Sequence, residues 1–179
     1  MKHYFLVAAT ALLVLSGLSS CSKDTPDVPP TPPAKSEAGF VHSVNIGENT
    51  YVSLFKDLTA GSLNTDNALV FAKGAFSFVH GGKVYVTDTE HLYKYAPKDG
   101  KLVQEGATMV FPSGAKATYI TFASNKKAYV SCLGIGKVWI IDPSSMTKTG
   151  EIDLSDYSLG KSSGDNNPEP CASVIDRKS

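Results

Sequence analysis

Two short polar segments hold the residue types that most often ligate metal ions. Residues 88–91 (DTEH) gather two carboxylates and an imidazole. Ser162–Pro170 supplies hard oxygens suited to calcium, from Asp165, Asn166, Asn167 and Glu169. Asp and Asn, however, also form turns with their own backbone and often precede Pro in ordinary loops. We therefore expect both segments to be turns and predict no metal site, with metal binding as the alternative.

Aromatic side chains offer a second route to a binding function. Tyr119 and Tyr157 lie near the ends of apolar runs, and Trp139 is the only tryptophan of the chain. Aromatic groups where loops converge on a pocket suit flat ligands such as catechols or hemes. Trp139 lies inside a predicted strand, so packing in the core is the alternative role for it. We predict Tyr119, Tyr157 and Trp139 as ligand-binding residues.

Motifs of catalysis and cofactor binding are missing from the sequence. It contains no Gly-x-Ser-x-Gly elbow, no His-Glu-x-x-His motif, no phosphate loop and no dinucleotide fingerprint. Residues 133–137 (LGIGK) have two glycines but join two apolar runs and precede no helix, which favours a hairpin loop. We predict that the protein is not an enzyme and has no cofactor.

The composition argues against nucleic acid as a partner. The 179 residues carry 17 basic and 17 acidic side chains, so the formal net charge is zero. Arg177 is the only arginine, although arginine is the residue suited to bidentate recognition of phosphates and bases. A hydrophobic fraction of 42% is typical of a globular domain.

The N-terminal residues indicate the cell envelope. A basic start is followed by an uncharged run from Tyr4 to Leu18, which is shorter than the about 20 apolar residues of a membrane-spanning helix. Residues 1–20 are therefore predicted to be a secretory signal peptide. Residues 18–21 (LSSC) resemble the bacterial lipobox, and this implies that Cys21 is lipidated and anchors the protein to a membrane. A plain cleaved signal is the alternative.

A tether follows the lipobox. Residues 21–39 contain five prolines and no aromatic residue. Such a segment cannot build a core and is predicted to be a disordered, polyproline-like linker. Together with the signal peptide, it leaves residues 40–179 for a folded domain.

Two cysteines remain after Cys21. In an oxidising envelope Cys132 and Cys171 could pair as a disulfide. Both lie beside apolar runs, so the alternative is that each is a small buried hydrophobe. The sequence leaves the two possibilities open.

From residue 45 onward, short apolar runs alternate with turn signals, and no helical period occurs. The predicted turns are Gly81-Gly82 as a two-residue hairpin turn, residues 97–100 and 142–145 as Pro-containing type I turns, and residues 124–127. The runs, rich in Val, Ile, Tyr and Phe, predict strands within residues 68–72, 76–88, 91–104, 118–133 and 137–154.

An internal repeat organises these strands. Residues 76–107 and 119–152 share one order of strand, tight turn, strand, loop, strand, Pro-containing turn and closing strand. Lys83–Val86 matches Lys127–Val130 at a spacing of 44 residues. A four-stranded unit of about 40 to 50 residues is typical of a β-propeller blade. A sandwich with two similar hairpins is the alternative.

The ends of the repeat predict an incomplete ring. Ser173–Lys178 falls where the next copy would start, and Thr50–Thr65 resembles the outer half of a blade. We therefore predict an all-β fold, a partial β-propeller of about two and a half four-stranded antiparallel blades. Propellers typically have about four to eight blades. We accordingly expect residues 40–179 to be the N-terminal part of a longer propeller or a truncated product of one.

Residues 129–152 resemble the Tyr-Val-Thr-Asn type of propeller repeat. The order of lipobox, Pro-rich linker, residues 51–65 and residues 164–170 (GDNNPEP) resembles a family of Bacteroidota surface lipoproteins. These are predicted seven-bladed propellers, some of them linked to TonB-dependent receptors and to capture of foreign siderophores. None of the matching segments is a binding motif, so the resemblance carries over no ligand residue.

Three functions follow from these features. The first is a surface-exposed outer-membrane lipoprotein that captures a small molecule, such as a ferric siderophore, for a TonB-dependent receptor. The second is a non-catalytic scaffold or sensor that binds protein or glycan at the cell surface. The third is an enzyme such as a propeller lyase or a quinone-dependent dehydrogenase. It ranks lowest because His80 and His91 have no counterparts at Ala123 and Leu133.

Overall fold

The computed structural model describes residues 40–55, 65–157 and 168–175, all within one compact unit spanning Ser36–Ser179. The predicted signal peptide, the lipidation of Cys21 and the Pro-rich linker lie outside the described residues. So do residues 56–64 of the expected blade half, residues 162–167 of the polar loop, and residues 176–179.

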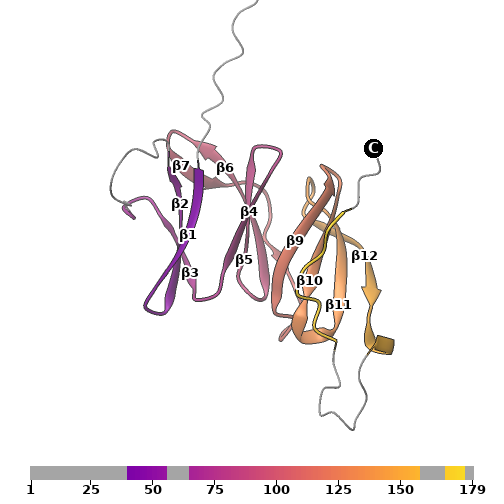
Figure 1. Ribbon diagram of the computed structural model, residues 1–179. Helices are drawn as coiled ribbons and strands as arrows, with labels where there is room; N and C mark the ends of the chain where they lie inside the picture. Colours follow the sequence, from indigo (N-terminus) through magenta and orange to yellow (C-terminus); the bar gives the residue numbers. More distant parts are fainter. Residues whose placement is uncertain (1–39, 56–64, 158–167, 176–179) are drawn as a thin grey trace, which may run out of the picture. The chain divides into compact units, whose positions relative to one another are not determined.

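The described residues are all-β and form three antiparallel sheets (Figure 1). In the first sheet the strand order is β1-β2-β3, with β1 at Phe40–Ile46, β2 at Asn49–Phe55 and β3 at Leu69–Ala72. Only the end of β1 was predicted, because the sequence pattern indicates strands from residue 45 onward. This sheet therefore has three strands where half a blade was expected.

The second and third sheets have the strand order of four-stranded blades. The second runs β4 (Phe76–His80), β5 (Lys83–Thr87), β6 (His91–Lys98) and β7 (Lys101–Gln104), and a short fifth strand β8 (Met109–Val110) pairs with β6. The third runs β9 (Ala117–Ser124), β10 (Lys127–Cys132), β11 (Lys137–Asp142) and β12 (Thr147–Asp153). The matched segments at residues 83–86 and 127–130 are the second strands of the two sheets, which confirms the repeat.

Contacts between the sheets follow the pattern of a partial β-propeller. The first strand of each sheet contacts the first strand of the next, β1 with β4 and β4 with β9. Ser43 on β1 and Ser77 on β4 share a hydrogen bond of 2.6 Å between their hydroxyl groups. The ring of Phe78 on β4 meets that of Tyr119 on β9 edge-on, at 5.1 Å between centroids. None of the three sheets closes on itself as a barrel.

Alternation along the strands divides the apolar side chains between two cores. On β5, Val84 and Val86 face the first sheet and pack near Val52, whereas Tyr85 faces the third sheet. The core between the second and third sheets holds residues of both, and Leu92 and Ile141 belong to the same buried cluster. Burial of each such Leu or Ile side chain stabilises the fold by about 1.5–3 kcal/mol. Each sheet therefore depends on its neighbour for a core.

The turns differ from expectation at one place. Gly81 and Gly82 form the predicted two-residue turn, with φ of +56° and +71°. Pro97, in contrast, is not in a turn: it belongs to β6 and pairs with Leu102. The turn consists of Asp99 and Gly100, at φ of +51° and +77°, because a short hairpin favours residues that tolerate positive φ.

The predicted strand at Ser173–Lys178 is not formed in its described part, since residues 168–175 contain no strand. The segment nevertheless lies against β9. The Thr121 hydroxyl donates to the carbonyl oxygen of Ser173 at 2.7 Å, and the Ser173 hydroxyl donates to that of Thr121 at 2.6 Å. Side-chain contacts of this kind replace the backbone ladder of a strand.

Candidate functional site

A cleft of about 180 Å³ lies between the second and third sheets. Its walls come from the β4–β5 turn, from β5 and β6, from the residue after β7, and from the β9–β10 and β11–β12 connections. The lining residues are His80, Gly81, Lys83, Tyr85, Lys94, Glu105, Asn125 and Ser144. The cleft therefore exists only where the two blades meet.

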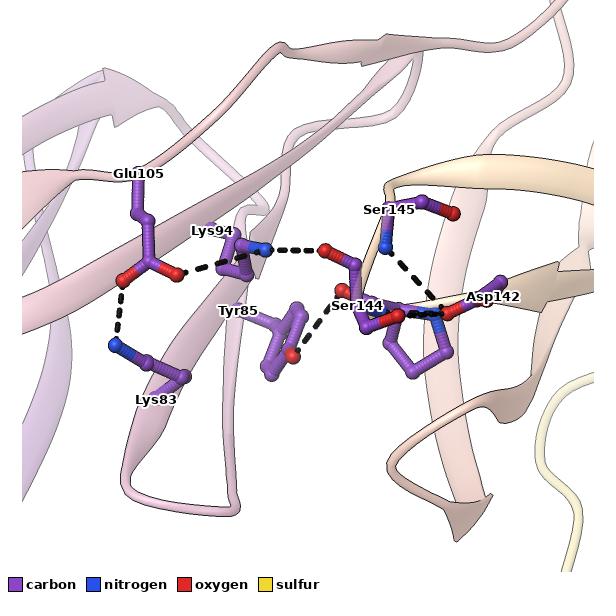
Figure 2. A network of polar contacts seen from close by, with 8 residues as sticks. Lys83, Tyr85, Lys94, Glu105, Asp142, Ser144 and Ser145 are labelled. Atoms are coloured by element: carbon purple, nitrogen blue, oxygen red, sulfur yellow. Dashed lines mark hydrogen bonds and ion pairs between the residues drawn. The ribbon is translucent and has the colours of Figure 1, made fainter. Parts of the chain in front are cut away.

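Lys94, which reaches toward both Glu105 and Ser144 (Figure 2), is the most buried of the described charged residues that line the cleft. It sits opposite Tyr85 in the β5–β6 ladder, so both side chains point to the third sheet. Only 7% of the residue is exposed. Its ammonium group donates a hydrogen bond of 2.8 Å to the carbonyl oxygen of Ser144. Because a buried lysine requires partners, this carbonyl holds the positive charge at the seam between the sheets.

Glu105 connects Lys94 to a second lysine. The backbone N–H of Glu105 donates to the carbonyl oxygen of Lys94 at 2.7 Å, which fixes the residue just beyond β7. One carboxylate oxygen accepts a hydrogen bond from Lys83 at 2.5 Å, and the other lies 3.7 Å from the Lys94 ammonium. The hydrogen bond from Lys83 lowers the pKa of Glu105 below its ordinary value. Glu105 is therefore an anion that both lysines hold.

Aromatic groups form the rest of the wall. Tyr85 is buried, and its hydroxyl lies 3.5 Å from the carbonyl oxygen of Pro143. Burial raises the pKa of Tyr85, so its hydroxyl stays protonated. The His80 ring stacks on Phe122 with centroids 4.4 Å apart and an interplanar angle of 2°. The His80 Nε2 atom lies 2.9 Å from the Asn125 side-chain oxygen, which links the two hairpin turns at the mouth.

The loop that presents Ser144 is held by Asp142 (Figure 2). The Asp142 carboxylate accepts hydrogen bonds from the Ser144 backbone N–H at 2.8 Å and from the Ser144 hydroxyl at 2.6 Å. These bonds, the hydroxyl first, lower the pKa of Asp142. Pro143 follows in the position that its fixed φ favours. The sequence of this turn thus aims the Ser144 carbonyl at Lys94.

The charged groups of this cleft have a positive balance. Two ammonium groups, of Lys83 and Lys94, face the single carboxylate of Glu105 among the described residues that line it. An anionic group is the ligand that such a set favours. Among the described residues that line the cleft, Ser144 is the only Ser, Thr or Cys, and its hydroxyl donates a hydrogen bond to the Asp142 carboxylate.

The structure does not bring the predicted ligand-binding residues together at this cleft. Trp139 is 9% exposed and packs in the core against Phe111, with ring centroids 4.8 Å apart. Tyr119 is 41% exposed beside Phe78, and Tyr157 is 76% exposed in the short 3-10 helix η2 (Ser155–Tyr157). None of the three lines the cleft, so their role as ligand residues stays a prediction.

Residues 88–91 lie at the connection between β5 and β6, as the sequence predicts, and His91 is the first residue of β6. The Asp88 carboxylate accepts hydrogen bonds of 2.9 Å from the His91 backbone N–H and from the Tyr93 hydroxyl, and it lies 2.9 Å from His91 Nδ1. Glu90 accepts a hydrogen bond of 2.9 Å from the Gly114 backbone N–H. In the part of the chain that the structure describes, no three His, Cys, Asp or Glu side chains gather in the way a metal ion needs.

Cys132 and Cys171 are both free in the structure, so the possible disulfide is not formed. Cys132 is buried in the core between the sheets, as one of the two interpretations expected, whereas Cys171 is exposed. Burial raises the pKa of the Cys132 thiol to about 11. Its thiolate form is therefore scarce at neutral pH.

Sequence reasoning missed the residues of the cleft. The available signal was Lys94, a charged side chain in the middle of the aromatic strand at residues 91–95 (HLYKY). A lysine inside such a strand must find an acceptor or a ligand. Its partners Glu105 and Ser144 lie 11 and 50 residues further along the chain and carry no signal of their own.

No protein-family model, no curated protein and no solved structure matches this chain. Residues 40–55, 65–157 and 168–175 include no helix with the length and hydropathy of a bilayer-spanning segment.

Proposed function

We propose that the protein is a non-catalytic, ligand-binding β-propeller lipoprotein of the bacterial outer membrane, exposed at the cell surface. The observation that supports binding is the cleft, in which Lys83 and Lys94 present two ammonium groups beside buried Tyr85. The support for the membrane anchor is the lipobox-like pattern that ends at Cys21. No cofactor takes part in this function.

The proposed cargo is a small anionic molecule, with a ferric siderophore as the example that the resemblance implies. A cleft of about 180 Å³ is smaller than the about 300–1,000 Å³ of pockets that enclose a drug-sized ligand. It would accept one catecholate or carboxylate arm of such a complex, while the remainder stays outside. Handover to a TonB-dependent receptor would then need release of a single arm.

Calorimetric titration of the full chain with 2,3-dihydroxybenzoate and with its ferric complex tests the proposal. We expect binding of both, with the affinity reduced more than tenfold by Lys94→Met, because the buried ammonium is lost. Lys101→Met is the matched control, since Lys101 is exposed on β7 of the same sheet and does not line the cleft. Equal affinities of the wild-type chain and the Lys94→Met variant would refute binding in the cleft.

Anchoring is tested separately by growth with radiolabelled palmitate. We expect the label on the wild-type chain in the outer-membrane fraction and no label on Cys21→Ser. Label on neither chain would contradict the lipoprotein assignment without affecting the cleft.

The alternative function, a scaffold that binds protein or glycan at the cell surface, has an observation of its own. Phe40 and Val79 on the first strands of two sheets are 51% and 61% exposed, and Tyr119 on the third is 41% exposed. Exposed apolar side chains on neighbouring elements favour contact with a macromolecule. Failure of both small anions to bind, together with co-purification of an outer-membrane protein, would favour this function.

A further inference from the structure

The Glu105 carboxylate occupies the position in the cleft that an anionic ligand would need. Of the residues that the structure describes around the cleft, Glu105 is the only acid, and it contacts both lysines, at 2.5 Å and 3.7 Å. A ligand carboxylate that pairs with both ammonium groups at once would take the place of the Glu105 carboxylate.

The two sides of this contact differ in mobility. The Lys94 side chain is 8% exposed and is held by the Ser144 carbonyl, so its ammonium is fixed. The Glu105 side chain is 42% exposed and lies beyond the last residue of β7, where its backbone N–H is bound to the Lys94 carbonyl oxygen independently of the carboxylate. Rotation of the Glu105 side chain into solvent would leave Lys94 bound to the Ser144 carbonyl oxygen. The Lys83–Glu105 pair joins two partly exposed side chains and contributes little to stability. A ligand carboxylate that takes the place of Glu105 would keep the buried Lys94 ammonium paired.

We propose that Glu105 is an internal competitor and that the cleft binds aromatic carboxylates, whose carboxylate group displaces that of Glu105 from Lys83 and Lys94. This proposal deepens the proposed function, because it rests on the cleft being a binding site. The carboxylate of the ligand takes over the two ion pairs, and no covalent bond changes. The ring of the ligand then lies toward the wall made by Tyr85 and by His80 on Phe122.

The shape of that wall explains why the ligand is aromatic. The His80 and Phe122 rings are parallel within 2°, and the Tyr85 ring lies 4.8 Å from that of Phe122. Flat rings stack or meet edge-on against such surfaces at comparable centroid distances. An aliphatic carboxylate would keep the ion pairs but lose these contacts.

Calorimetric titration of the full chain with benzoate tests the proposal, with benzamide as the uncharged ligand of the same shape. We expect benzoate to bind, benzamide not to bind, and Glu105→Gln to bind benzoate about fivefold more tightly than wild type, because the competing charge is gone. Lys94→Met should lose benzoate binding, and Lys101→Met should bind as wild type does. Circular dichroism of each variant checks that the sheets are intact.

The outcomes separate this proposal from the one on which it depends. If wild type binds benzoate or 2,3-dihydroxybenzoate and Glu105→Gln binds them no more tightly, the proposal that Glu105 competes with the ligand is wrong. The proposal that the cleft binds small anions would still stand. If neither wild type nor Glu105→Gln binds either anion, the proposed function fails as well. Equal binding of benzamide and benzoate would refute recognition of the carboxylate.

Discussion

Single residues determine what the cleft can bind. Lys94 is nearly buried, and its ammonium group has two acceptors nearby, the Ser144 carbonyl oxygen at 2.8 Å and the Glu105 carboxylate at 3.7 Å. Burial of an ammonium group without such partners would cost several kcal/mol, on the order of the whole stability margin of a small domain. The two acceptors belong to different sheets: Glu105 follows β7 of the second sheet, and Ser144 lies between β11 and β12 of the third. Both interactions of Lys94 can therefore form only when the two sheets are in contact.

The two described cysteines should differ sharply in reactivity. Cys132 is buried with a pKa of about 11, so about one thiol in a thousand is ionised at about pH 8. We expect iodoacetamide to label the exposed Cys171 in the folded protein and to leave Cys132 unmodified, with both labelled in guanidinium. Peptide mass spectrometry reads each site separately. Labelling of Cys132 as fast as that of Cys171 in the folded state would contradict its burial.

Among the structural elements, Gly134 allows two connecting segments to pack closely against each other. The 3-10 helix η1 (Leu133–Ile135) after β10 packs on the loop before β9, where the Gly134 backbone N–H donates to the Ala115 carbonyl oxygen at 2.9 Å. A Cβ atom on Gly134 would lie 2.0 Å from the Gly114 carbonyl oxygen. That distance is far below van der Waals contact, so the backbone itself would have to move.

We expect Gly134→Ala to lower the free energy of unfolding by about 1–3 kcal/mol, the usual cost of forcing atoms into a filled space. Gly150→Ala on β12 is the control, because the nearest atom to its added Cβ is an Ile140 methyl at 3.6 Å. Chemical denaturation of both variants measures the difference. A loss at Gly150 as large as that at Gly134 would show that the close approach is not the cause.

Most of the strands could be predicted from the sequence, and the cleft could not. Strands of alternating Val, Ile and Tyr bounded by Gly81-Gly82 or by Asp142-Pro143 carry their own signals, because pattern and turn chemistry are local. The turn predicted at residues 97–100 was placed one residue too early. Asp99 and Gly100 form its centre because they tolerate positive φ better than Lys98. The cleft depends on how one sheet packs on another, and no local pattern encodes that.

On the scale of the whole molecule, the second and third sheets share one core. Leu92 on β6 and Ile141 on β11 are both fully buried in the same cluster, and Phe111 contacts Trp139 there. Neither sheet could keep these side chains from water without the other. We therefore expect the two sheets to unfold in a single cooperative transition.

Leu92→Ala tests this cooperativity, since it removes side-chain volume in the second sheet, whereas the fluorescence of Trp139 monitors the unfolding of the third sheet. We expect a loss of about 2–5 kcal/mol that shifts the Trp139 fluorescence transition and the circular dichroism transition together. Val103→Ala on β7, where Val103 is 47% exposed, should shift neither by much. Separate transitions for the two signals would mean that the sheets fold independently.

The most direct test of the binding account is an NMR titration of the full, isotope-labelled chain with 2,3-dihydroxybenzoate. We predict that the perturbed backbone amides cluster at the residues that line the cleft, above all at Gly81, Lys83, Glu105, Asn125 and Ser144, while Tyr157 is unaffected. Shifts that gather around Tyr119 or Tyr157 instead, or a spectrum that does not change at saturating ligand, would contradict the assignment of the cleft as the binding site.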